Sequence, residues 1–441
     1  MAQPVDIPPD PTAATEAAQA EVPPALVAQS LPDYVRAWGA RMRGGEIGVL
    51  PVVVGLVACM VVFEIISPNH VFLHADNIVN LFQQSAVYMV LAMAEIFPLI
   101  LGEIDLSIGY VGACGAVIAV QLVQPVTTHW PWWAAILAAL AFCAAVGAIQ
   151  GTIITRLGIP SFIVTLAGYL IFNGVMLILL LLGPFSGYPN LVSSDPNVHV
   201  LYNLMAASID PTYSWIVMGV AVAGLGALMW FGDARRRRQG LVAPPASLTL
   251  IKIGLIAVAG IVVVAICNIN RANTGFLAGV PWVVPIVLVI LAMWTILLER
   301  TQYGRYVYAI GGNAEAARRA GINVKMVVTI AFALCSMTAC VGVILFASYI
   351  GGMSNNVNGG QMVLFAVAAA VIGGTSLFGG RGKALHGVLG GLVIGAIYNG
   401  MYLQSLDVQR IFIVTGLVLL AAVTIDAVSR RGNVSLPGTR R

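Results

Sequence analysis

The sequence predicts an all-α protein that crosses a membrane many times. Hydrophobic residues make up 59% of the 441-residue chain and charged residues 9%, whereas an ordinary soluble domain is roughly 25% charged. Apolar runs of about 18 to 25 residues recur along the chain, and each is long enough to span a hydrocarbon core of roughly 30 Å as a helix. Because these runs are continuous, they do not fit the alternating strands of a membrane barrel.

About twelve transmembrane helices are expected, one for each long apolar run. Their ranges are 47–67, 78–101, 106–124, 132–155, 161–182, 213–232, 249–268, 281–298, 326–350, 361–378, 384–403 and 411–429. Residues 1–46 are rich in Ala, Pro and Glu and lack the apolar core of a secretory signal, so a disordered tail is expected there. Residues 47–430 would form the transmembrane domain and residues 431–441 a second tail.

Lysine and arginine indicate which side each loop faces, because cytoplasmic loops of membrane proteins are enriched in them. With the N-terminus in the cytoplasm, all 22 Lys and Arg residues except Arg271 and Arg410 fall in inward-facing segments. We therefore expect an even number of spans and both termini in the cytoplasm. The net charge of +4 follows from this topology and requires no nucleic acid partner. The four arginines at 235–238 are interpreted as the anchored end of a helix, with contact to anionic lipid or a partner as the alternative.

A polar, basic segment at residues 299–325 separates the apolar runs 281–298 and 326–350. A chain that only turned back into the membrane would need a few residues here. The centre of this segment is instead Ala-rich, charged and favourable to helix. The segment is therefore predicted to be held by a cytoplasmic partner. The alternative is an amphipathic loop that lies on the membrane surface.

Carboxyl groups interrupt the apolar sequence in one region. Glu103 and Asp105 lie between two expected spans, and Glu95 lies inside the second span. Charges at this depth are costly unless they face water or a partner. Residues 102–109 are therefore interpreted as a break between helices that lines a cavity or an inner mouth. For Glu95, a functional role and a neutral packing role both stay open.

Small residues recur at helical spacing in two expected spans. Gly387, Gly391 and Gly395 are four apart, and a second set, Gly109, Gly112 and Gly115, is three apart. Each set lies on one helical face and predicts close helix packing, with pore lining as the alternative. The six cysteines fall in expected spans without metal-like spacing and are predicted to be packing residues. Asn173 and Asn399 are expected to make interhelical hydrogen bonds, with contact to a substrate as the alternative.

The largest outward segment, residues 183–212, contains four prolines and few charges. It is expected either to lie across a periplasmic opening or contact an external partner, or to be a stiff connector. No nucleotide-binding motif is present, since Gly382-Lys383 is followed by Ala384 and Leu377 stands where the first glycine should be. Neither ATP binding nor catalysis by this chain is expected, and no metal site is expected.

Three segments together resemble a known family. They are residues 102–109 (Gly-Glu-Ile-Asp-Leu-Ser-Ile-Gly), residues 303–324, and residues 373–382 (Gly-Gly-Thr-Ser-Leu-Phe-Gly-Gly-Arg-Gly). In this order they resemble the permease subunits of bacterial ABC monosaccharide importers, over roughly residues 47–430. The xylose type is the most similar, because residues 213–270 correspond to its extra helix pair beside a ten-helix core.

This resemblance implies a membrane permease subunit in the bacterial inner membrane that has no catalytic site and binds no cofactor. The implied partners are a cytoplasmic ABC ATPase dimer that uses ATP, a periplasmic sugar-binding protein, a second copy of this chain and the lipid bilayer. No nucleic acid is implied. Two sequence segments then acquire roles, residues 299–325 as the coupling loop and residues 102–109 as part of the pathway.

The coupling loop of such permeases carries Glu-Ala-Ala-x-x-x-Gly, although here no Leu-Pro follows it. The residues assigned to ATPase coupling are Gly312, Asn313, Glu315, Ala316, Ala317, Arg318 and Gly321. Those assigned to the translocation pathway are Glu95, Gly102, Glu103, Asp105, Ser107, Gly109, Gly374 and Ser376. A twelve-span, ion-coupled secondary sugar transporter is the alternative, with Glu95 or Asp105 as its proton site.

Overall fold

The computed structural model describes residues 49–405 except 185–186, 241–242 and 273–274, together with Arg36, Asp407, residues 409–417, Leu420 and Thr424. The expectations for the two tails lie outside the described residues, apart from Arg36. The chain divides into two compact units. One contains Pro211–Ile266, and the other contains Gly48–Asp210 and Cys267–Arg431.

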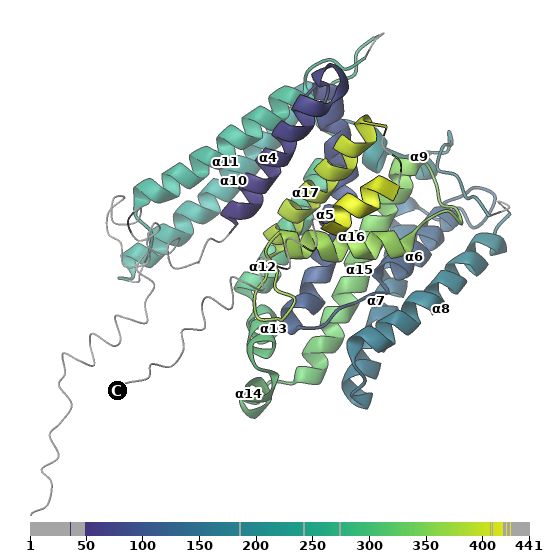
Figure 1. Ribbon diagram of the computed structural model, residues 1–441, viewed down its shortest axis with the longest axis vertical. Coiled ribbons are helices and arrows are strands. Elements are labelled where there is room, and N and C mark those ends of the chain that lie inside the picture. Colours follow the sequence, from purple (N-terminus) through teal and green to yellow (C-terminus); the bar gives the residue numbers. More distant parts are fainter. Residues whose placement is uncertain are drawn as a thin grey trace, which may run out of the picture. The chain divides into compact units, whose positions relative to one another are not determined.

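Regular structure in the described part is helical apart from two isolated β-bridges. The helices of the larger unit are α4 (Leu50–Ile66), η1 (Pro68–His70), α5 (Ala75–Leu101), α6 (Ile108–Leu122), α7 (Trp132–Leu157), α8 (Ser161–Leu182), α9 (Pro196–Ala206), α12 (Val283–Arg300), α13 (Gln302–Gly312), α14 (Ala314–Arg319), α15 (Val324–Ile350), α16 (Gly359–Ile372) and α17 (Ala384–Leu403). The other unit contains α10 (Pro211–Arg238) and α11 (Ala246–Cys267). Figure 1 shows the arrangement of the helices within each unit.

The fold class expected from the sequence is confirmed, since the chain is an all-helical, polytopic membrane protein. Among the described residues, eight helices are long and apolar enough to cross a membrane, and α4, α6 and α16 are shorter apolar helices. Each of the first eleven expected spans coincides with one of these helices. The twelfth, 411–429, is described only in part, and its described residues are helical.

The span expected at 361–378 was wrong at its C-terminal end. Helix α16 stops at Ile372, because Gly373 and Gly374 follow it and Gly374 adopts a left-handed φ of +110°. At about 1.5 Å per residue, the 14 residues of α16 reach roughly 21 Å, which is less than the hydrocarbon thickness. Residues 373–383 form a turn instead of a helical continuation.

Helix α5 is the centre of the larger unit and is buried along nearly its whole length. It packs against α12, α15, α16 and α17 (Figure 1). The glycine face of α17 explains how closely α17 approaches. A Cβ at Gly387 would lie 2.7 Å from the Met93 nitrogen, and one at Gly395 would lie 1.9 Å from Ser85 Oγ. The close packing predicted for this glycine set is therefore confirmed.

Polar groups also join α5 to α17. Asn77 Nδ2 donates to Asn399 Oδ1 at 2.8 Å, and Asn399 Nδ2 donates to Gln84 Oε1 at 3.3 Å. The interhelical hydrogen bond predicted for Asn399 is confirmed. Inside an apolar bundle, such a pair of amides satisfies groups that lipid could not.

The second glycine set brings α6 close to three neighbouring helices. A Cβ at Gly109 would lie 2.0 Å from the Gly359 carbonyl, and one at Gly115 would lie 2.5 Å from the sulfurs of Cys143 and Cys340. Both cysteines are free and fully buried. The packing roles predicted for this glycine set and for these two cysteines are confirmed.

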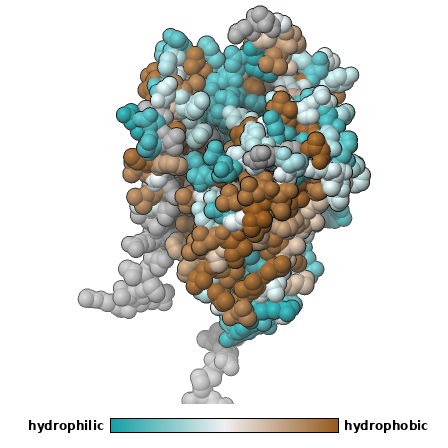
Figure 2. Space-filling view, turned by 90° about the vertical axis from the view of Figure 1, so that its right-hand side faces the viewer, coloured by the Kyte–Doolittle hydropathy of each residue, from teal (hydrophilic) through white to brown (hydrophobic). Residues whose placement is uncertain are grey.

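Apolar side chains cover the outer face of α8, as a membrane requires. Leu170, Leu181 and Leu182 are 65%, 74% and 73% exposed. On the face turned to the viewer in Figure 2, hydrophobic surface forms a broad band between hydrophilic ends. Trp130, Trp132 and Trp133, at the start of α7, are also partly exposed, which is typical of side chains at the membrane interface.

The unit of α10 and α11 is a helix pair with its own contacts. Gly226 of α10 lies against Ile253, and Gly260 of α11 lies against Met218. Thr249 Oγ1 donates to Asp233 Oδ2 at 2.8 Å. The four arginines at 235–238 form the last turn of α10. The guanidinium of Arg237 lies 5.6 Å from the Trp230 ring centroid.

Helix α9 was not expected in the segment 183–212. Asp195 caps it, since its Oδ1 accepts from the backbone N–H groups of Asn197 and Val198 at 2.9 and 3.2 Å. Pro196 occupies the first helical turn, where a missing N–H costs nothing. Asp195 followed by Pro196 is a sequence signal for the start of a helix. The prediction for residues 183–212 did not use this signal.

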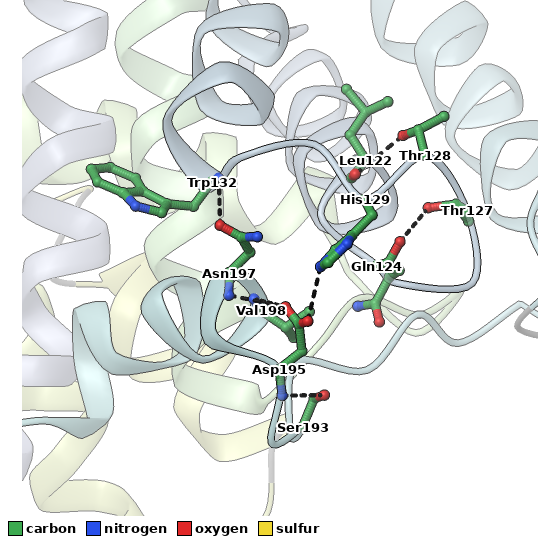
Figure 3. Close-up of polar contacts among 10 residues, drawn as sticks. All are labelled: Leu122, Gln124, Thr127, Thr128, His129, Trp132, Ser193, Asp195, Asn197 and Val198. Atoms are coloured by element: carbon green, nitrogen blue, oxygen red, sulfur yellow. Dashed lines mark hydrogen bonds and ion pairs between the residues drawn. The ribbon is translucent and has the colours of Figure 1, made fainter.

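An imidazole ties the loop between α6 and α7 to the start of α9 (Figure 3). His129 Nε2 lies 2.8 Å from Asp195 Oδ2, and the Trp132 N–H donates to Asn197 Oδ1 at 3.3 Å. Partial desolvation raises the pKa of Asp195, but hydrogen bonds from Val198, His129 and Asn197 outweigh it and lower this pKa below its ordinary value.

Candidate functional site

The polar segment 299–325 folds into two short helices, α13 and α14, joined at Asn313. Asn313 ends α13 and caps α14, because its Oδ1 accepts from the Ala316 N–H at 2.9 Å. Thr301 caps α13 in the same way by accepting from the Gly304 N–H at 3.2 Å. A cap of this kind stabilises a helix by about 1 kcal/mol. The caps hold α13 and α14, which we call the arm, in one shape.

Helix α14 turns its charged side chains outward. Glu315 pairs with Arg318 and with Arg319, whose Nε lies 3.0 Å from Glu315 Oε1. All three side chains are about half exposed or more, whereas Ala317 is 5% exposed. Exposed pairs of this kind contribute about 0–1 kcal/mol to stability. The charged face of α14 is therefore not needed to fold the arm.

Gly321 ends the arm with a left-handed φ of +84°. Its N–H donates to the Arg318 carbonyl at 3.0 Å, and the Ile322 N–H donates to the Ala317 carbonyl at 3.1 Å. This turn sends the chain into α15. Apart from its chain neighbours and its own helix backbone, no atom of the described residues lies within 4 Å of a Cβ placed at Gly321 or at Gly312. At Gly321 it is the backbone conformation that favours glycine.

Two tyrosine hydroxyl groups hydrogen-bond α13 to other parts of the larger unit. Tyr308 Oη donates to the Gly382 carbonyl at 2.7 Å, and Tyr303 Oη donates to the Val327 carbonyl at 3.3 Å. Burial, with a smaller effect from Glu299, raises the pKa of Tyr308 to about 12. The Tyr308 hydroxyl therefore stays protonated near neutral pH and continues to donate to residues 373–383.

The three sequence segments that carried the resemblance meet at one place, which we call the glycine junction: Gly102, Gly311, Gly379 and Gly380. The Gly380 N–H donates to the Ile100 carbonyl at 2.8 Å. A Cβ at Gly311 would lie 1.9 Å from the same carbonyl, and one at Gly379 would lie 2.9 Å from the Gly311 carbonyl and 3.1 Å from the Gly102 nitrogen. Side chains do not fit here, so α13, the end of α5 and the turn 373–383 touch through their backbones.

Behind the junction, the break between α5 and α6 is held by buried carboxyl groups. The Asp105 N–H donates to Glu95 Oε1 at 3.0 Å, and the Ser107 N–H donates to Asp105 Oδ1 at 2.9 Å. Glu95, Asp105 and Ser107 are all 0% exposed. Backbone groups that leave a helix inside an apolar bundle need partners, and these carboxyl groups supply them.

The cluster extends to α7 and α15. Ser107 Oγ lies 2.6 Å from Asp105 Oδ1 and 3.0 Å from Gln150 Oε1, and Cys335 Sγ lies 3.8 Å from Glu95 Oε2. Asp105 Oδ2 and Gln150 Nε2 have no hydrogen-bond partner among the described residues. A hydroxyl carries one proton, so Ser107 cannot donate to both Asp105 and Gln150. With the Gln150 amide turned by 180°, Gln150 Nε2 donates to Ser107 Oγ, and Ser107 Oγ donates to Asp105. This orientation gives Gln150 Nε2 a hydrogen-bond partner.

A family model described as "Branched-chain amino acid transport system / permease component" matches residues 77–423. This range contains the arm, the glycine junction and the buried cluster. The chain belongs to this permease family.

Curated relatives in this family are similar over most of their length. The "Xylose transport system permease protein XylH" of Escherichia coli (strain K12) is 31% identical over 381 residues, covering 86% of this chain and 92% of that protein. The protein of the same name from Haemophilus influenzae is 32% identical, with coverages of 85% and 95%. The "Ribose import permease protein RbsC" of E. coli (strain K12) is 27% identical, with coverages of 85% and 92%. No solved structure matches this chain.

In this permease, the residues assigned to the pathway separate into two places. Glu95, Asp105 and Ser107 lie in the buried interior of the larger unit, and Gly109 packs against α16. Gly102, Gly374 and Ser376 belong to the junction and its turn. The Ser376 N–H donates to the Arg381 carbonyl at 2.9 Å, and Ser376 Oγ accepts from the Phe378 N–H at 3.0 Å. Glu103 is half-buried between the two places. Their assignment to the pathway stays a prediction.

The sequence interpretation missed Gln150 and Cys335 as members of the buried cluster. Gln150 is a polar side chain inside the apolar run 132–155, which was the one available signal. No sequence signal was available for Cys335, because a buried cysteine behaves as a small hydrophobic residue both in this cluster and elsewhere.

Proposed function

We propose that this chain is the membrane permease subunit of an ATP-driven importer of a pentose of the xylose type. The relatives named as xylose permeases, at 31% and 32% identity over most of both chains, support this substrate class. The arm is the structural observation that carries the coupling role, since a charged, capped helix stands outward where folding does not need it.

In this proposal the arm docks on a cytoplasmic ATPase dimer, which binds and hydrolyses ATP. Glu315, Arg318 and the turn at Gly321 form the contact, and Gly312 and Asn313 set the angle between α13 and α14. This chain binds no cofactor and catalyses no reaction. Both termini face the cytoplasm of a bacterial inner membrane, as the Lys and Arg distribution indicates.

The glycine junction then transmits the movement of the arm. Where two backbones touch directly, no side chain can change its rotamer to accommodate a displacement. Closely packed interiors transmit strain. A shift of α13 therefore moves Ile100 and the break that follows it. Glu95, Asp105 and Ser107 keep the break intact while it moves. A periplasmic binding protein delivers the sugar, and a second copy of this chain completes the pathway.

Reconstitution tests this proposal. Proteoliposomes containing this chain are loaded with ATP, with and without the ATPase subunit and the sugar-binding protein. Labelled xylose, ribose and leucine are offered in turn, because the family description names amino acid transport. Import of xylose that requires ATP and both partners is expected. Uphill sugar uptake by the chain alone on an ion gradient would support the secondary-transporter alternative, and leucine uptake would move the substrate to the amino acid class.

A further inference from the structure

A groove lined mainly by apolar residues, with three polar side chains among them, opens on the larger unit at the break between α5 and α6. It has a volume of about 380 Å³. Leu106 contributes to it from the break, Leu166 and Tyr169 from α8, and Asn358 and Gln361 from the start of α16. Phe412 also lines it. None of these residues belongs to the pathway set predicted from the sequence.

Polar side chains are out of place on this face if lipid covers it. Around them, Leu166 and Leu364 are 48% and 61% exposed. Asn358 Oδ1 accepts from the Gln361 N–H at 3.0 Å, but the side-chain amide of Gln361 has no partner among the described residues. Transfer of an amide to an apolar medium is costly when the amide loses water without gaining a partner. The side-chain amide of Gln361 therefore favours an occupant that can form hydrogen bonds.

The side chains that line the groove indicate which class of molecule it can bind. Among the described residues that line the groove, none has a charged side chain. The amides of Asn358 and Gln361 and the hydroxyl of Tyr169 can donate and accept hydrogen bonds, while the rings of Tyr169 and Phe412 offer apolar faces. Hydroxyls around a ring with apolar C–H faces, as in a neutral monosaccharide, match this combination.

The aromatic wall is rigid. The rings of Tyr169 and Tyr110 are edge to face at 4.8 Å between centroids. A Cβ at Gly360 would lie 2.5 Å from Tyr169 Oη, so glycine leaves the room that the phenol occupies. The phenol of Tyr169 is thus wedged between α6 and α16 and does not swing freely.

The groove is also tied to the break that the junction would move. Thr165 Oγ1, on α8, donates to the Ile104 carbonyl at 3.3 Å, and the Ile104 N–H donates to Ser161 Oγ at 3.4 Å. Leu106 stands between Asp105 and Ser107, whose side chains are locked in the buried cluster. A displacement of the break therefore moves Leu106 and the α8 wall together.

We propose that this groove is the half-site through which a neutral monosaccharide passes, with Tyr169, Asn358 and Gln361 as its contacts. A second copy of the chain closes the open side. This inference rests on the proposed function and adds the residues that touch the sugar.

Cysteine accessibility in the complete importer tests whether the groove is aqueous. Cys59→Ser removes the one native cysteine that is not buried. Asn358→Cys and Gln361→Cys are then compared with Ile171→Cys, because Ile171 is 59% exposed and lies about 200° around α8 from Tyr169. A membrane-impermeant thiol reagent should modify the two groove cysteines, and xylose supplied with ATP and binding protein should slow this modification. The Ile171→Cys variant should remain unmodified.

Transport by substituted importers tests the sugar contact itself. Gln361→Leu should lower the maximal uptake rate about three- to tenfold, as expected for one lost hydrogen bond. Gln361→Asn should recover part of this loss. Stimulation of ATP hydrolysis by the loaded binding protein should remain, which a folding defect would not allow. Tyr169→Phe, which removes one oxygen, is the matched second variant.

The outcomes separate the two proposals. Unreactive groove cysteines, or reactivity equal to that of Ile171→Cys, in an importer that takes up sugar would overturn the groove alone. Normal uptake by both Gln361→Leu and Tyr169→Phe would overturn the sugar contact. A wild-type complex without ATP-driven sugar uptake would overturn the proposed function and the sugar assignment with it.

Discussion

Gly311 of α13 lies directly against the carbonyl group of Ile100 at the end of α5, so closely that a Cβ would be 1.9 Å from the oxygen. The same oxygen accepts the Gly380 N–H. One carbonyl thus receives the arm and the turn 373–383 together. Ile100 lies two residues before the break at 102–107, so this contact connects the arm to the break.

Gly311→Ala should disturb this contact, because the added methyl group has no space between two backbones. We expect a lower thermal unfolding temperature and weaker coupling of ATP hydrolysis to uptake. Gly174→Ala in α8 is the matched control, since no neighbouring side chain of the described residues lies within 4 Å of its Cβ. Melting of the purified chain and uptake by the reconstituted importer measure both effects. Equal behaviour of the two variants would contradict a role for the Ile100 contact.

Glu315→Ala should abolish uptake without unfolding the protein. The exposed pairs of Glu315 with Arg318 and Arg319 contribute about 0–1 kcal/mol to stability, so the melting temperature should change little. Gly321→Val should also abolish uptake, because valine strongly disfavours a φ of +84°. Binding of sugar to the periplasmic receptor should be unchanged in both. Normal uptake in both variants would exclude the arm from coupling.

Asp105→Ala and Asp105→Asn separate structure from transport. Alanine removes the acceptor of the Ser107 N–H and hydroxyl, and each buried group left unsatisfied costs about 1–3 kcal/mol. Asparagine retains an acceptor oxygen, so its loss of stability should be smaller. If the carboxyl group serves transport, Asp105→Asn should lower uptake while membrane insertion and melting stay near those of wild type. Wild-type flux would leave Asp105 with a structural role.

The tie between His129 and Asp195 should weaken in acid. Since the pKa of Asp195 is lowered in the folded protein, its contribution to stability is fully present above the ordinary carboxyl pKa and is lost as the pH falls through the lowered value. Asp195→Asn keeps an N-cap but removes the charge. Melting temperature measured against pH should fall less steeply in acid for this variant than for wild type. An identical acid dependence would show that this carboxylate does not contribute.

Much of the fold follows from local sequence. Apolar runs long enough for a bilayer can satisfy their backbone only as helices, so the spans were predictable to within a few residues. The glycine sets on α6 and α17 were predictable for the same kind of reason, since their spacing places them on one face. Asp195 and Pro196 are a sequence signal for the start of α9, but the surrounding prolines favoured the prediction of an irregular segment.

The sequence by itself determined a polytopic helical permease with a charged arm after α12, because hydropathy, charge and helix propensity act over a few turns of chain. Only the tertiary structure decided what the polar residues meet. It brought Gly311, Gly379 and Gly380 to one carbonyl, that of Ile100. It also enclosed Glu95 and Asp105 with Gln150, and it placed Tyr169 and Gln361 in the lining of one groove. These residues lie far apart in the chain, and no local preference specifies which distant helix face packs against which.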